Sequence, residues 1–203
     1  GRRVTMVLRP AAGGTGIVFR RTDLGVDIPA RFDRVADTRL CTALVAADAP
    51  QARVGTVEHV MAALAGTGVT DAVVELDGPE VPILDGSAAP FVFLIDCAGT
   101  TALPLAAPVL EVLRPVRVED GEAFAELHPA STAGFEAALT IDFPSTAIGR
   151  QSLSLRVTAA SFRGGLADAR TFALAEDIAR LRAAGLAQGG SLANAVVVDG
   201  PLV

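Results

Sequence analysis

The chain has 203 residues, which is enough for one large or two small domains. Hydrophobic residues make up 51% of it and the formal net charge is -6, so the composition allows a substantial core and argues against a nucleic-acid partner. Two cysteines, Cys41 and Cys97, form no disulfide framework, which fits a reducing compartment, and we expect a cytoplasmic protein. The longest apolar run, residues 88–95, is too short for a membrane span.

Strand-like runs alternate with two helical patterns in the first half of the chain. Strands are expected at residues 4–8, 17–20, 28–35, 39–46 and 72–76. A second helix is expected at residues 88–97, after Ser87 as its cap. Its inward side chains would be Phe91, Leu94 and Ile95.

The first helix is expected at residues 56–66, where Thr56 can cap the start and Gly66 can end it. Its apolar residues repeat at i, i+3, i+4 and i+7 and form one face: Val57, Val60, Met61 and Leu64. Glu58 and His59 share its first turn. A carboxylate beside a neutral imidazole can act as base and metal ligand in metal-assisted hydrolysis. Most such pairs are solvated surface residues, so this alternative stays open.

The second half starts after an uncharged stretch rich in proline and alanine, residues 101–108, which reads as a linker. A hairpin around Asp120 and Gly121 is expected from strands at residues 116–119 and 123–127. Further strands are expected at residues 135–143, 152–157 and 195–198, and one helix at residues 174–184. Leu8-Arg9-Pro10-Ala11 is echoed by Leu127-His128-Pro129-Ala130, which suggests two copies of one α/β unit. The second copy reads as unfinished, so we expect a segment of a longer protein.

Taken in order, several motifs resemble those of the UDP-3-O-acyl-N-acetylglucosamine deacetylases, the zinc amidases that commit lipid A synthesis. The first is Thr56-Val57-Glu58-His59 with its following alanines and Gly66. The others span residues 20–24, 37–42, 82–92, 169–172, 189–191 and 196–199.

The resemblance implies an α+β fold of two similar α/β sandwich domains, each a small sheet packed on helices, with the active site between them. The first domain would span residues 1–107 and the second, incomplete, residues 108–203. An insert at about residues 161–190 would form the hydrophobic passage for an acyl chain. The alternative for the apolar residues of that insert, Phe162, Leu166, Phe172 and Leu174, is that they are ordinary core residues.

For the site, the resemblance implies Glu58 as general base, His59 as the first zinc ligand and Thr171 as a stabiliser of the tetrahedral oxyanion. Substrate-site positions would be Leu40, Cys41, Phe172, Ala173, Leu174, Gly189 and Gly190. Zn²⁺ is the implied cofactor and an acylated UDP-sugar the implied substrate. A monomer without nucleic acid or membrane span is expected.

The chain departs from the family pattern in four ways. Neither the later motif that supplies two more zinc ligands nor the later general-acid histidine is matched. The family's opening motif is not matched either, and Gly1 corresponds to the last glycine of that motif. Ala173 and Leu174 replace the usual glycine and phenylalanine, and His128 reads as a surface or structural residue. A non-catalytic module that binds an acylated nucleotide-sugar or a partner protein is therefore the alternative to the enzyme.

Overall fold

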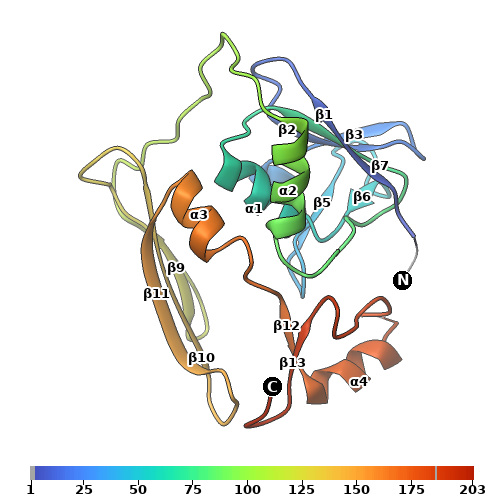
Figure 1. Ribbon diagram of the computed structural model, residues 1–203, viewed down its shortest axis with the longest axis vertical. Coiled ribbons are helices and arrows are strands. Elements are labelled where there is room, and N and C mark those ends of the chain that lie inside the picture. Colours follow the sequence, from blue (N-terminus) through green and yellow to red (C-terminus); the bar gives the residue numbers. More distant parts are fainter. Residues whose placement is uncertain (1–2, 186) are drawn as a thin grey trace.

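The computed structural model describes residues 3–185 and 187–203, so the prediction for Gly1 lies outside the described residues. Figure 1 shows the first half of the chain at the upper right, two long hairpins at the left, and a small unit below. Strands and helices are mixed throughout, which confirms the expected α+β class. None of the helices in the described part combines the length and apolarity needed to cross a membrane.

A four-stranded sheet and two helices form the first half. The sheet order is β1 (Met6–Pro10), β7 (Ala72–Leu76), β2 (Ile17–Arg21) and β3 (Val26–Pro29). Helices α1 (Glu58–Thr67) and α2 (Ala89–Ala98) share one buried cluster with this sheet. Along β7 every second side chain is buried, because successive residues of a strand face opposite sides of the sheet.

A smaller sheet completes this half, in the order β4 (Val35–Asp37), β5 (Ala43–Val45) and β6 (Arg53–Val54). The expected single strand at residues 28–35 is wrong. β3 ends at Pro29, which has no amide hydrogen to continue a ladder, and the short 3-10 helix η1 (Phe32–Arg34) follows. The expected strand at residues 39–46 shortens to β5, since its first residues form a loop.

The apolar face predicted for α1 is confirmed, but both predicted ends are wrong. Val57 occupies the cap position and Thr56 lies outside the helix with a left-handed φ of 57°. The helix ends at Gly68, whose φ is 78°, and Gly66 is an interior residue. In α2, Phe91 and Ile95 are buried as predicted, whereas Leu94 is 45% exposed.

The second half starts with two antiparallel hairpins. β8 (Val116–Asp120) pairs with β9 (Ala123–Leu127), and β10 (Phe135–Phe143) pairs with β11 (Gly149–Val157). The predicted turn at Asp120 and Gly121 is confirmed. Large apolar side chains of these strands are exposed, including Phe124, Phe135, Leu139 and Leu153.

The chain then returns to the first half. Helix α3 (Ala159–Gly165) lies between β11 and α1 (Figure 1). β12 (Phe172–Leu174) and β13 (Val196–Val198) form a parallel pair beside α4 (Ala175–Ala183). The ring of Phe162 in α3 enters the first-half core, where it lies against Gly66 of α1. Of the two readings left open for Phe162, the structure therefore supports the core residue.

Candidate functional site

The Glu58 carboxylate is held at the start of α1 by a neighbouring loop. Its Oε2 accepts a hydrogen bond of 3.0 Å from the amide of Thr42. The carbonyl of Thr42 in turn accepts from the amide of Val57 at 3.3 Å. These two bonds fix the carboxylate in the first turn, where the helix dipole also favours an anion.

The turn before α1 has an unusual backbone. Thr56 is 7% exposed and adopts φ 57°, a conformation that costs a β-branched residue energy. Its hydroxyl donates to Glu80 Oε1 at 2.7 Å. The expected capping role of Thr56 is therefore replaced by a bond to the loop that follows β7. Strain of this kind is found where a surrounding structure holds a functional group in place.

The loop before β5 presents an exposed apolar side chain next to this turn. Leu40 is 71% exposed and has a left-handed φ of 64°. Cys41 is partly buried, with its Sγ 3.8 Å from the position that a Cβ would take on Gly55. Both predicted substrate-site residues thus precede Thr42, the residue that holds Glu58.

The segment between β7 and α2 links the start of α1 to the second half of the chain. At one end, the amide of Gly55 donates to Pro79 and its carbonyl accepts from Val81. At the other end, the carbonyl of Gly86 accepts from the amide of Thr171 at 2.8 Å. One short segment therefore contacts both the Glu58 region and Thr171.

Thr171 is fixed by its backbone on both sides. Its amide bonds Gly86, and its carbonyl accepts from the amide of Val196 at 3.0 Å. Its Cγ2 lies 3.2 Å from the position that a Cβ would take on Gly86. Thr171 is partly buried, and within the described residues its hydroxyl makes no hydrogen bond.

The remaining predicted substrate residues fall into two groups. Phe172 packs edge-on against Phe143 with ring centroids 5.2 Å apart. Leu174 lines a hollow of about 220 Å³ together with residues 144–146 and 198–200. Ala173 lies between them in β12, in register with Val197.

Gly189 and Gly190 lie in an exposed turn after α4, outside the lining of that hollow. The carbonyl of Gly189 accepts from the Asn194 side chain at 3.0 Å, and that of Gly190 accepts from Arg182 at 3.3 Å. Leu186, which belongs to the expected insert at residues 161–190, lies outside the described residues.

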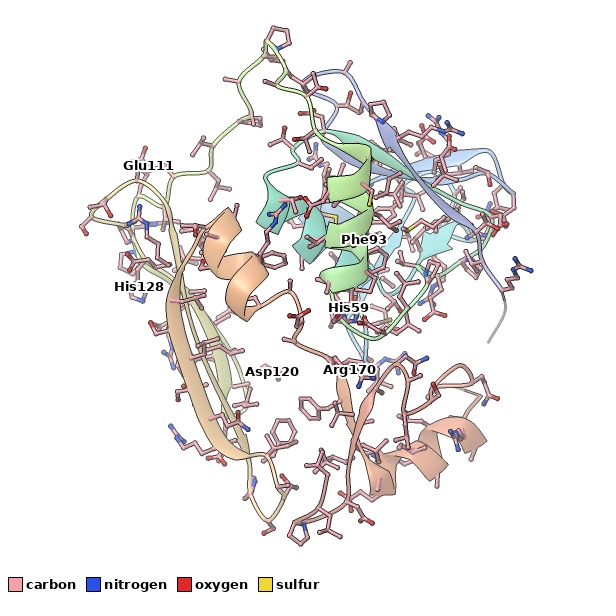
Figure 2. All side chains as sticks on the ribbon, in the orientation of Figure 1. His59, Phe93, Glu111, Asp120, His128 and Arg170 are labelled. Atoms are coloured by element: carbon pink, nitrogen blue, oxygen red, sulfur yellow. The ribbon has the colours of Figure 1, made fainter. Side chains whose placement is uncertain are left out.

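The two histidines lie far apart (Figure 2). His59 is half-buried in α1, whereas His128 is exposed after β9 and its Nε2 lies 2.9 Å from Glu126 Oε2. The pKa of Glu126 is lowered by this contact and by Arg117. His128 is therefore a surface residue, as the sequence indicated.

A complete zinc site does not fit the residues present. A catalytic zinc takes three protein ligands, and His59 is one candidate. Within residues 3–185 and 187–203 no three His, Cys, Asp or Glu side chains come together in a way that could hold a metal ion. The described part of the chain therefore does not hold the three ligands of such a site by itself.

Sequence reasoning missed three residues that build this site. The amide of Thr42 donates to Glu58, and the carboxylate of Glu80 accepts from Thr56. Arg170, the residue before Thr171, donates to the carbonyl of Asp85. Thr42 and Arg170 belong to the motifs at residues 37–42 and 169–172. Their place in those motifs was the available signal, but their partners are distant in the sequence.

Comparison with known proteins agrees with the motifs. The family model described as LpxC: UDP-3-O-acyl N-acetylglycosamine deacetylase matches residues 1–203. A protein of Photobacterium profundum, named UDP-3-O-acyl-N-acetylglucosamine deacetylase, is 48% identical over 203 residues, which are 98% of this chain and 66% of that protein. A protein of the same name from Anaeromyxobacter dehalogenans is 49% identical over 199 residues, which are 98% of this chain and 63% of that protein. The chain spans about two thirds of the length of the curated relatives it matches.

Proposed function

Because this chain belongs to the UDP-3-O-acyl N-acetylglycosamine deacetylase family, we propose that it provides part of a zinc-dependent deacetylase. The substrate is UDP-3-O-acyl-N-acetylglucosamine, and the reaction is hydrolysis of its acetamide in lipid A biosynthesis. The family assignment confirms the resemblance drawn from the motifs, and the names of the relatives support the reaction.

The observation that carries the proposal is the fixed position of Glu58. Its carboxylate is held by the Thr42 amide at the start of α1, beside His59. A general base must be held within hydrogen-bond reach of the proton that it removes. Glu58 takes the proton of the attacking water and leaves its second carboxylate oxygen bonded to Thr42.

Thr171 stabilises the developing oxyanion in this proposal. Its backbone is bonded on both sides and its hydroxyl has no partner in the described residues. A donor that is already in place needs no reorganisation when charge develops, and losing one such donor costs about 10²–10³ in rate.

His59 is the one zinc ligand that this chain contributes. Because the described residues bring together no three possible ligands, the rest of the zinc site and the acid that protonates the leaving amine would come from other residues of the full-length protein. The division into residues 1–107 and 108–203 belongs to this proposal as well. So do a monomeric state and a cytoplasmic location, of which the free cysteines Cys41 and Cys97 support only the location.

In this proposal the acyl chain binds along residues 161–190, at the substrate positions Phe172, Ala173, Leu174, Gly189 and Gly190. Leu174 and Val198 are apolar parts of the lining of the hollow there, beside polar residues such as Asp199. Phe162 has no part in the passage because it is buried against α1.

The test is Glu58→Gln in the full-length protein. Glutamine keeps an oxygen that can accept from Thr42 but cannot take a proton at neutral pH. We expect kcat to fall about 10²–10⁴-fold while zinc content and thermal stability stay near wild type. Glu75→Gln, on the outer face of β7, is the control and should keep full turnover. Near-normal turnover of Glu58→Gln would refute the role of Glu58.

The alternative is a non-catalytic module that binds an acylated nucleotide-sugar or a partner protein. Such a module would hold its ligand without hydrolysing it, and the described residues bring together no three metal-ligating side chains. Substrate binding without any turnover by the zinc-loaded full-length protein would support this alternative over the enzyme.

A further inference from the structure

Arg170 precedes Thr171 and joins two segments that are far apart in the sequence. Its Nε donates to the carbonyl of Asp85 at 2.8 Å, and its Nη2 donates to the carbonyl of Leu192 at 3.1 Å. Figure 2 shows Arg170 where the chain enters β12, on the side that faces the first half.

Backbone carbonyls are the only partners of this guanidinium among the described residues. The Asp85 carboxylate is engaged elsewhere, because its Oδ1 accepts from the amide and the hydroxyl of Ser87. A hydrogen bond from a charged donor to a carbonyl is stronger than one between neutral groups. Arg170 therefore serves as a cross-link between two stretches of backbone.

Two further contacts, both at Gly86, lie beside the cross-link that Arg170 makes. Thr171 bonds the carbonyl of Gly86, the residue after Asp85. Gly86 has φ 84°, and a Cβ on it would overlap the carbonyl oxygen of Asn194. The three segments thus meet at a point where no side chain fits between them.

Fixing the backbone of Thr171 also fixes its hydroxyl. Threonine is branched at Cβ, so few χ1 rotamers are open to it once φ and ψ are set. Its Cγ2 faces Gly86, which leaves the hydroxyl a restricted direction.

We propose that Arg170 is a positioning residue, which orients the Thr171 hydroxyl by tying residues 85–86 to residues 192–194 across it. This rests on the proposed role of Thr171 in catalysis. A displacement of about 1 Å at a catalytic group can cost about 10²-fold in rate, so a cross-link that prevents such a displacement preserves the rate.

The first test does not depend on activity. In the full-length protein, Arg170→Gln should speed amide hydrogen exchange about tenfold in peptides that cover residues 84–88 and 191–196. Arg156→Gln is the matched control, because Arg156 also donates to a backbone carbonyl, that of Ala133, and to Thr132 Oγ1. It should leave both peptides unchanged. Unchanged exchange in Arg170→Gln would overturn the proposal.

The second test is a double-mutant cycle of Arg170→Gln and Thr171→Val, with kcat and KM measured for each. We expect Arg170→Gln to lower kcat about 10- to 100-fold with little change in KM. In the Thr171→Val background it should cost no more than about twofold. Independent, multiplying losses would show a merely structural Arg170 and overturn the proposal.

The two proposals fail in different ways. If the zinc-loaded wild-type protein does not hydrolyse the substrate, the proposed function fails, and the exchange experiment still decides whether Arg170 ties residues 84–88 to residues 191–196. If the wild-type protein is active but Thr171→Val is as active as it, the role of Thr171 fails and the positioning proposal fails with it.

Discussion

Replacing Gly66 with alanine should destabilise the protein, although alanine is the better helix former. Gly66 lies inside α1, where a Cβ would overlap Cδ1, Cγ and Cε1 of the Phe162 ring, all of them closer than the 3.0 Å that real Cβ atoms keep. Phe162 is 6% exposed and packs in the core, so its ring has no free space to move into.

The magnitude follows from two opposing terms. Removing a glycine from a helix interior gains about 1 kcal/mol, because the unfolded chain loses freedom. Inserting a methyl group into a packed core costs about 1–3 kcal/mol. The sum is a net loss of up to about 2 kcal/mol. For a chain of about 200 residues each kcal/mol lowers the melting temperature by about 2–4 °C, and the shift is smaller in the longer full-length protein.

The effect of Gly66→Ala on stability should change sign when the Phe162 ring is removed. Phe162→Ala alone should cost about 3–5 kcal/mol, but in that background Gly66→Ala should become stabilising by about 1 kcal/mol. Gly164→Ala in α3 is the control, since a Cβ there meets nothing within 4 Å, and it should stabilise. Thermal unfolding of the full-length protein measures all four variants. If Gly66→Ala stabilises the wild type as Gly164→Ala does, the contact between Phe162 and Gly66 is refuted.

Three further predictions follow from the surface and the substrate site. Arg39 lowers the pKa of Asp37 from 3.8 to about 2, so the pair stabilises the fold above about pH 4 and loses this effect as the pH falls toward 2. Arg39→Gln should return the Asp37 pKa toward 3.8 in an NMR titration; an unchanged value would contradict the pairing. A leucine in place of Gly189 or Gly190 should shift the preference to shorter acyl chains in turnover assays, whereas an equal loss for every chain length would count against a passage there. Residues 1–203 alone should retain substoichiometric zinc after dialysis and show no turnover, because His59 is their one predicted ligand; equimolar zinc with turnover would disprove this.

The sequence predicted what depends on neighbours a few residues away. The apolar repeat of α1 placed Val60 and Leu64 in the core, because a helix brings residues three and four apart onto one face. The strand predicted at residues 72–76 is β7, with the same bounds. The motif order indicated the family, and the comparison confirmed it.

Tertiary structure decided what depends on partners distant in the sequence. Thr56 looked like a cap, but its hydroxyl binds Glu80 instead. Gly66 looked like a helix end, but it is an interior residue that leaves room for Phe162 from the second half. Arg170 belonged to the motif at residues 169–172, but that motif gave no sign of its partners, because both acceptors are backbone carbonyls, 85 and 22 residues away. Local pattern reports propensity and periodicity, whereas a bond or a close approach between remote segments exists only once the chain has folded.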